Sequence, residues 1–121
     1  LPDDRPIMMI NLVRFRPQAL YPAAHPMINK RIAGAEAYKL YRREAAAPFT
    51  RAGGEQIWTG TPELTLIGPR DEAWDIAFIA RYPTGAAFLE MLRDPEYQQA
   101  VVHRQAAVSN SRLIRCGEGG A

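Results

Sequence analysis

Cysteine, histidine and long hydrophobic runs are all scarce in this 121-residue sequence. The single cysteine, Cys116, cannot form an internal disulfide, and no Cys/His cluster has the spacing of a zinc site. No apolar run approaches the ~20 residues that a membrane-spanning helix requires, and no signal-peptide pattern is present. We therefore expect a cytoplasmic protein that holds no metal and has no membrane partner.

Clustered positive charge is also missing. The formal net charge is +2, and the basic residues occur in pairs rather than in a tract. A nucleic-acid-binding domain more often carries a basic face with interleaved aromatic residues, so we expect no nucleic-acid partner. Gly53-Gly54 is followed by neither the helix nor the lysine of a phosphate-binding loop. We therefore expect no bound cofactor.

The length and the hydrophobic content of 47% are typical of a globular domain with an ordinary core. We predict one domain over residues 1–121, with a long Pro-rich connection over 16–32 and a flexible tail over 117–121. The connection retains apolar residues that a disordered segment would lack. We expect it to be ordered, either as a lid that supplies Tyr21 or His25 to a cavity or as a clasp on a partner subunit.

The pattern along the chain predicts strand, helix, strand, strand, two short helices and strand. The expected elements are strands over 7–15, 55–67 (interrupted at Gly60-Thr61-Pro62), 74–82 and 111–116, a helix over 33–52, and helices capped by Thr84 and Asp94. The last helix is expected to bury Tyr97, Ala100, Val101, Arg104 and Val108. This order predicts an α+β, ferredoxin-like βαββαβ fold, a split βαβ with an antiparallel sheet.

The first strand is apolar on both of its alternating faces, which is typical of a strand covered on both sides. Helices are expected to cover one face of the sheet. In a chain this short, a second copy of the chain is the expected cover for the other face. We therefore predict a homodimer.

The chain contains several distinctive short motifs, namely Ala52-Gly53-Gly54, Tyr82-Pro83-Thr84, Asp94-Pro95-Glu96-Tyr97-Gln98, Arg104, Ala107 and Ser111. Together they resemble a known family of small proteins, the domain of unknown function family 1330. The resemblance covers roughly residues 33–116 and implies a dimeric α/β barrel, in which two ferredoxin-like sheets pack face to face. The family name assigns no activity. The wider barrel group includes cofactor-free monooxygenases, lactone isomerases and haem-handling enzymes, so the fold alone says little about function.

His103 is the candidate catalytic residue, because it is the only histidine expected within a regular element. A general base would need a partly buried imidazole of this kind. The alternative is a histidine on the helix surface. We favour this alternative because no second histidine or acid lies nearby in the sequence.

The candidate ligand-binding residues are polar or aromatic side chains expected near a cavity between helices and sheet. They are Asn11, Arg14, Tyr41, Trp58, Arg81 and Arg104. Asn11 and Arg14 interrupt an apolar strand, so each needs a partner, which is either a ligand or a group across the subunit interface. Arg104 could line a pocket with Arg81. The favoured interpretation is that its stem packs on Tyr97 while its head pairs with Glu96 or a terminal carbonyl.

These features predict a small-molecule-binding protein, of which one form is a cofactor-independent enzyme of the monooxygenase or isomerase type. The expected ligand is a small organic acid, a lactone or an aromatic compound. The alternative is a non-catalytic, homodimeric structural or interaction module. The cavity distinguishes the two, because a cavity filled by Tyr41, Trp58 and Phe78 would leave no room for a ligand.

Overall fold

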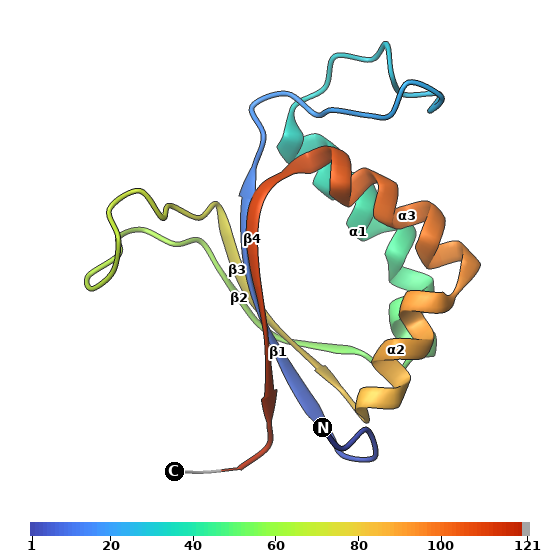
Figure 1. Ribbon diagram of the computed structural model, residues 1–121, viewed down its shortest axis with the longest axis vertical. Helices are drawn as coiled ribbons and strands as arrows, with labels where there is room; N and C mark the ends of the chain where they lie inside the picture. The colour runs from blue at the N-terminus through green and yellow to red at the C-terminus, as the bar shows by residue number, and fades with distance from the viewer. Residues whose placement is uncertain (120–121) are drawn as a thin grey trace.

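The structure, a computed structural model that describes residues 1–119, is a four-stranded antiparallel sheet with three helices on one face (Figure 1). The elements are β1 (Ile7–Phe15), α1 (Gly34–Arg51), β2 (Glu55–Gly60), β3 (Ile76–Tyr82), α2 (Gly85–Arg93), α3 (Pro95–Ala107) and β4 (Val108–Gly117). The strand order β2-β3-β1-β4, with every neighbouring pair antiparallel, is that of the split βαβ unit. The predicted α+β, ferredoxin-like fold is confirmed. No helix within the described residues is long and apolar enough to cross a membrane.

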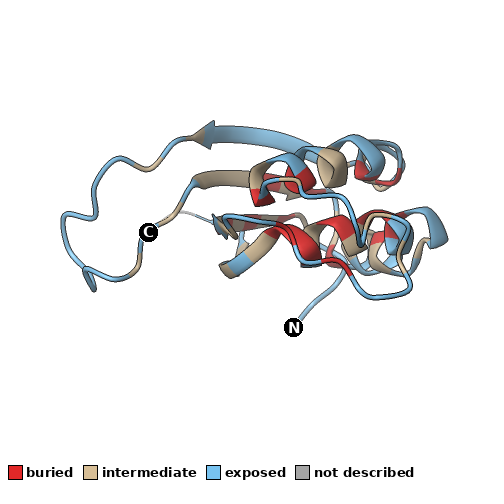
Figure 2. Cartoon of the chain, turned by 90° about the horizontal axis from the view of Figure 1, so that it is seen from above, coloured by how far each residue is buried: buried red, intermediate tan, exposed pale blue. Residues whose placement is uncertain are grey.

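The two faces of the central strand β1 have different surroundings. Its odd-numbered side chains, such as Ile7 and Val13, point toward the helices and are buried. Its even-numbered side chains, such as Met8 and Ile10, point away from the helices and are half-buried. The buried residues gather on the helical side of the sheet (Figure 2). Helices cover one face as predicted, and cover of the other face by a second copy stays a prediction.

Side-chain caps begin both of the short helices where the sequence predicts them. The Thr84 hydroxyl accepts a hydrogen bond from the Ala87 N–H at 3.0 Å. The Asp94 carboxylate accepts one from the Glu96 N–H at 2.9 Å, with Pro95 at the first helical position. Each cap satisfies a helix N–H group that the helix itself leaves unpaired. Both predicted helix starts are confirmed.

The strand predicted over 55–67 is wrong in its second half, because β2 ends at Gly60. Residues 61–75, which we call the arm, leave the sheet and project from it on the left of Figure 1. Pro62 lacks the N–H that a sheet ladder uses, and the described residues place no strand beside this segment. Its apolar residues have the composition of a strand but do not form one.

The predicted boundaries of the last two strands also need correction. β3 begins at Ile76 instead of Trp74, where the arm rejoins the sheet. α3 passes directly into β4, which begins at Val108 instead of Ser111. Val108 therefore belongs to a strand and not to the buried stripe of α3. That stripe consists of Tyr97, Ala100, His103, Ala106 and Ala107, because α3 packs against α1 as well as facing the sheet.

The Pro-rich connection is ordered against the ends of α1 and α3, at the top of Figure 1. The Leu20 N–H donates to the Ala106 carbonyl at 2.9 Å, and Tyr21 is buried. Gly34 permits this close approach, since a Cβ atom at Gly34 would lie 2.1 Å from the backbone oxygen of Arg16. At the other end of the chain, β4 extends through Gly117, and residues 120–121 of the predicted tail lie outside the described residues.

Candidate functional site

A cavity of about 630 Å³ lies between the helices and the sheet. Side chains from all four strands and all three helices line it. Gln56 on the edge strand β2 and Leu113 on the opposite edge strand β4 both line the cavity and are exposed, so it opens at the edges of the sheet. Its volume falls within the range of about 300–1,000 Å³ that is typical of small-molecule sites.

Four tyrosines give the cavity an aromatic wall with polar tips. They are Tyr38, Tyr41, Tyr82 and Tyr97. The hydroxyls of Tyr41 and Tyr97 are 2.9 Å apart, and the rings of Tyr38 and Tyr41 are 5.4 Å apart. Burial raises the pKa of Tyr38, Tyr41 and Tyr82 above its ordinary value. These phenols therefore stay protonated at neutral pH and can donate hydrogen bonds.

Two arginines are the only charged side chains on the cavity lining among the described residues. Arg42 donates from Nη2 to Gln56 Oε1 at 2.6 Å, and its guanidinium lies 5.4 Å from the centroid of the Phe78 ring. The Arg104 side chain makes no hydrogen bond or ion pair with any residue in 1–119, although the residue is half-buried. Positive charge without a facing carboxylate favours an anionic ligand.

The charge of Arg104 acts on the phenol beside it. Burial is the larger effect on the pKa of Tyr38 and raises it, while the charges of Arg104 and Arg42 oppose that rise. Asn11, which is 9% exposed, supplies a buried amide on the sheet side of the cavity. Its Nδ2 donates to the Met9 carbonyl at 3.1 Å. The site therefore combines a cation, neutral phenol donors and an amide within one mostly apolar cavity.

The structure brings three of the six predicted ligand-binding residues together. Asn11, Tyr41 and Arg104 all line the cavity, and their role in ligand binding stays a prediction. The favoured pairing of the Arg104 head is wrong, because its side chain has no hydrogen bond or ion pair among residues 1–119 and Glu96 pairs instead with Arg51, at 3.0 Å. Arg104 lines a pocket, as the other interpretation proposed, but without Arg81.

The other three predicted residues lie away from the cavity, on the sheet face opposite the helices. A bulge between Gln56 and Trp58 turns Trp58 away from the helices, and its side chain is 53% exposed. Arg81 has the wrong parity on β3 to reach the cavity and pairs with Glu118 at 2.7 Å. Arg14 likewise lies on the even-numbered face of β1 and is exposed. Their predicted placement beside the cavity is wrong.

His103 also lies outside the cavity, and its favoured interpretation as a surface residue is wrong. The side chain is buried between α3, α1 and the Pro-rich connection. Its Nε2 lies 2.8 Å from a Glu44 carboxylate oxygen, and its Nδ1 lies 2.6 Å from the Tyr21 hydroxyl. A carboxylate only accepts hydrogen bonds, so in the neutral ring Nε2 carries the proton and Nδ1 accepts from Tyr21.

The cluster around His103 fixes the connection rather than serving the cavity. The His25 ring stacks on Tyr21 with centroids 4.8 Å apart. Neither Tyr21 nor His25 lines the cavity, so the predicted lid that would supply one of them to a ligand there is wrong. The partners of His103 lie 82 and 59 positions away in the sequence, which is why local sequence did not reveal them. No group of three metal-ligating side chains converges within residues 1–119.

Sequence reasoning missed Arg42 and Gln56 as cavity residues. Arg42 follows the predicted Tyr41 directly and lies one helical turn after Tyr38, so the helical spacing carried a signal. Gln56 carried none, because its direction depends on the bulge that follows it. Tyr38, which also lines the cavity, was not among the predicted ligand-binding residues.

The sequence matches the family described as Domain of unknown function (DUF1330) over residues 24–116. It is 52% identical to a protein of unknown function from Rhodopseudomonas palustris, RPA0582, whose crystal structure superposes with a TM-score of 0.89. That match covers 99% of this chain and 87% of the other. A comparison with curated proteins found no match.

Two more distant structures share the fold. A dimeric protein of unknown function with a ferredoxin-like fold from Bacteroides fragilis has a TM-score of 0.57 at 12% identity, and the match covers 93% of this chain and 96% of that chain. The cofactor-independent oxygenase SnoaB from Streptomyces nogalater has a TM-score of 0.55 at 19% identity, with 97% and 96% of the two chains covered. At these identities the likeness concerns the fold alone.

Proposed function

Because this chain belongs to the DUF1330 family, whose name assigns no activity, we propose a function from its cavity: binding of a small organic acid with an aromatic or apolar body. One observation carries the proposal. The cavity of about 630 Å³ is lined by aromatic side chains and by two arginines, and no carboxylate among the described residues faces them. An apolar site with a few convergent polar groups is the usual form of a small-molecule site.

The acid group is proposed to meet Arg104. A guanidinium prefers a carboxylate partner in a paired, two-hydrogen-bond geometry, and Arg104 has no partner of this kind among residues 1–119. Tyr38 adds a neutral donor beside it, since burial keeps this phenol protonated. The aromatic body of the ligand then lies against the remaining tyrosines and Phe78.

A further step of the proposal is that the protein converts its ligand as an enzyme without a cofactor. The fold that it shares with a cofactor-independent oxygenase supports this step by analogy only. Among the described residues, no histidine or carboxylate lines the cavity, so the lining offers no ordinary general base. Chemistry in this cavity would therefore rest on Arg104 and neutral phenols that stabilise a negative charge on the ligand. Acid–base catalysis by His103 would need a ligand elsewhere.

The alternative, a non-catalytic homodimeric module, has one observation in its favour. The sheet face opposite the helices is apolar and exposes Ile114 at 48% and Trp58 at 53%. A ferredoxin-like neighbour is described as dimeric, which supports a homodimer by analogy of fold. A homodimer is compatible with a ligand in each cavity, so we propose the dimer together with binding. The open cavity weighs against a module without a ligand.

A ligand panel tests the proposed function on the wild-type protein. We expect thermal denaturation to shift upward with 2-naphthoate and with aliphatic acids of similar size, because these place a carboxylate at Arg104. The matched amide, 2-naphthamide, should give a much smaller shift at the same concentration. Equal shifts with the acid and the amide would contradict recognition of an anion, and no shift with any member of the panel would contradict the binding site itself.

A further inference from the structure

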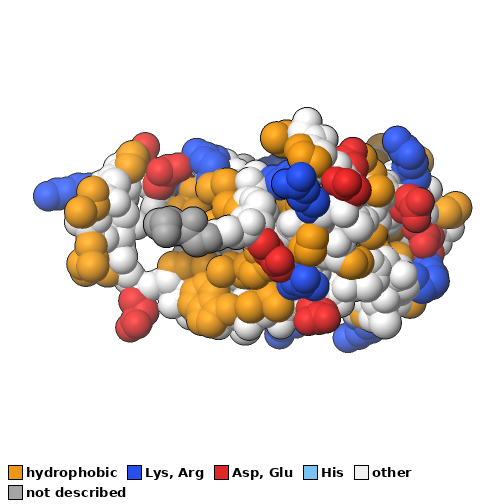
Figure 3. Space-filling view, turned by 90° about the horizontal axis from the view of Figure 1, so that it is seen from below, with side chains coloured by type: hydrophobic (Ala, Val, Ile, Leu, Met, Phe, Trp, Pro, Cys, Tyr) orange, Lys and Arg blue, Asp and Glu red, His pale blue; other side chains and the backbone are white. Residues whose placement is uncertain are grey.

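The arm, residues 61–75, is the part of the molecule that the proposed ligand site leaves unexplained. It stands apart from the helices in Figures 1 and 2, on the side of the sheet opposite them. Leu64, Leu66 and Ile67 are exposed at 77%, 87% and 96%. Figure 3 shows hydrophobic side chains gathered on this projection, at the left of the view. Single exposed leucines are ordinary, whereas three aliphatic side chains within four residues indicate a contact surface.

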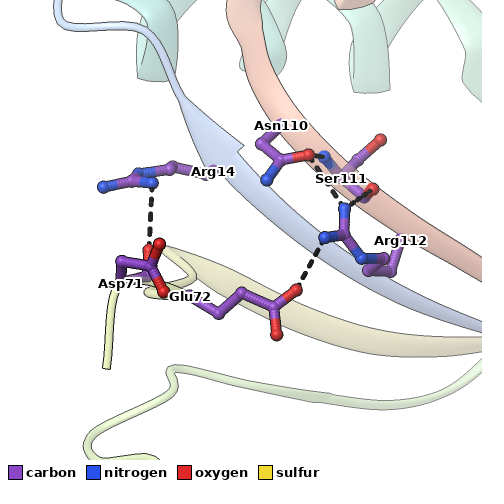
Figure 4. Close-up of polar contacts among 6 residues, drawn as sticks. All are labelled: Arg14, Asp71, Glu72, Asn110, Ser111 and Arg112. Carbon is purple, nitrogen blue, oxygen red and sulfur yellow. Dashed lines mark hydrogen bonds and ion pairs between the residues drawn. The ribbon is translucent and has the colours of Figure 1, made fainter. Parts of the chain in front are cut away.

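Polar contacts fix the base of the arm to its own sheet (Figure 4). An Arg112 Nη2 atom lies 2.6 Å from a Glu72 carboxylate oxygen, and the Arg112 guanidinium lies 5.2 Å from the centroid of the Trp74 ring. Arg14 Nη1 donates to the Asp71 carbonyl at 3.5 Å. These contacts set the direction of the arm before any partner arrives. Less conformational freedom is then lost on association.

The open sheet face lies on the same side as the arm and indicates what the partner is. Ile79, Ile10 and Ile114 form one row across three adjacent strands, in direct register with each other. Two of the three arginines at the margins of this face, Arg81 and Arg112, are already paired with acids of their own chain, and the third, Arg14, donates to the Asp71 carbonyl. A face that is apolar at its centre and has most of its marginal charge paired can pack on itself across a two-fold axis.

The sheet face is a small platform for a dimer. Four strands at a spacing of ~4.8 Å and seven paired residues at a rise of ~3.4 Å give roughly 450 Å² in flat projection. Stable interfaces bury about 800 Å² of accessible surface from each partner, so contacts beyond this face would strengthen the dimer. The arm continues the apolar surface of this face toward the side where a second copy would lie. It supplies contact that the sheet alone lacks.

We propose that the arm is a dimerisation arm, which lays Leu64, Leu66 and Ile67 on a second copy of this chain. Under two-fold symmetry each subunit receives the arm of the other, while the two open sheet faces pack together. This inference rests on the homodimer of the proposed function but not on its ligand. The partner is another copy rather than an unrelated protein, because the arm and the apolar face lie on one side of one chain.

Sedimentation velocity over a dilution series measures the dimer dissociation constant for the wild type and three variants. The arm variant combines Leu64→Ser, Leu66→Ser and Ile67→Ser. The matched control is Leu89→Ser, which removes a leucine exposed at 37% on α2, on the helical side of the sheet. The face variant is Ile114→Arg, which places a charge in the isoleucine row. All changes lie on exposed side chains outside the core, and circular dichroism checks that each variant folds.

We expect the arm variant to raise the dissociation constant at least tenfold, the control to change it less than twofold, and the face variant to be monomeric. An arm variant that dimerises like the wild type, while Ile114→Arg is monomeric, would overturn the arm and leave the sheet-face dimer standing. A wild type that stays monomeric at about 100 μM would overturn both the arm and the proposed dimer. The naphthoate titration is independent of these outcomes, so failure of the ligand site remains distinguishable.

Discussion

His103 and Arg104 follow one another on α3, yet their side chains lie in opposite surroundings. Both ring nitrogens of His103 have partners, the Tyr21 hydroxyl and the Glu44 carboxylate. Arg104 faces the cavity on the sheet side and has no partner among the described residues. Successive helical residues are turned by about 100°, so one helix can present a side chain to each layer.

The comparison distinguishes two roles for a polar side chain. His103 stabilises the fold, whereas Arg104 is available to a ligand. A buried group with all its partners stabilises the structure, and removing it leaves those partners unsatisfied. A charged group that borders a cavity without a partner adds little to stability, because nothing in the protein depends on it. We therefore expect substitutions on the His103 side of α3 to cost stability, and substitutions on the Arg104 side to cost binding.

The largest loss of stability is expected from Gly34→Ala. This substitution disturbs the close backbone contact between α1, the Pro-rich connection and the end of α3. The new Cβ would lie 2.1 Å from the Arg16 oxygen and 2.8 Å from the Ala107 oxygen, and neither backbone atom can move cheaply. We expect a loss of more than about 3 kcal/mol in urea denaturation. Gly117→Ala is the control, since nothing lies within 4 Å of its new Cβ. Equal stability of the two variants would show that the connection does not seat closely on α1.

The next largest loss is expected from His103→Leu, of about 2–3 kcal/mol in the free energy of unfolding. The substitution leaves the buried Tyr21 hydroxyl without its acceptor and frees Glu44. Gln105→Leu, at an exposed position of the same helix, is the matched control and should change stability by less than about 0.5 kcal/mol. Urea denaturation of both variants provides the measurement. A loss below about 0.5 kcal/mol for His103→Leu would contradict its structural role.

Alkaline titration examines the cavity side, where the pKa values of Tyr38, Tyr41 and Tyr82 are raised by burial. A folded-state pKa above the unfolded value of ~10 contributes stability that is complete below that pH and is lost as the pH rises above it. We expect the absorbance change of these phenols at alkaline pH to coincide with loss of the circular dichroism signal. Ionisation of all five tyrosines near pH 10 in a folded protein would contradict their burial.

Local signals in the sequence were enough to predict much of the fold. The caps at Thr84 and Asp94 depend on neighbouring residues only, and both helix starts are correct. The apolar run over residues 7–15 likewise predicted a strand, and β1 has these bounds. The segment 61–67 has the composition of a strand but no strand beside it, and pairing is a property of the whole fold that composition does not encode.

The candidate site was less predictable because it depends on contacts between distant residues. Tyr41 and Arg104 could be placed from helical spacing. A single bulge moved Trp58 to the opposite face of the sheet, and strand sequences do not specify such an insertion reliably. The partners of His103 come from α1 and the Pro-rich connection, so its burial followed from tertiary packing.

The smallest effect on stability is expected from Arg104→Gln. No hydrogen bond or ion pair within the described residues is lost, so the free energy of unfolding should change by less than about 0.5 kcal/mol. Urea denaturation beside Arg43→Gln, an exposed neighbour of the cavity residue Arg42, provides the comparison. A loss as large as that of His103→Leu would show that Arg104 is structural and would remove the contrast between the two residues.

Calorimetric titration of 2-naphthoate into Arg104→Gln and Arg43→Gln tests the ligand site most directly. Both variants lose one positive charge from the helical layer, but only one loses it from the cavity. We predict that Arg104→Gln weakens binding at least tenfold, which corresponds to about 1.4 kcal/mol, and that Arg43→Gln changes it less than twofold. Equal affinity of the two variants for 2-naphthoate would contradict an acid-binding site at Arg104.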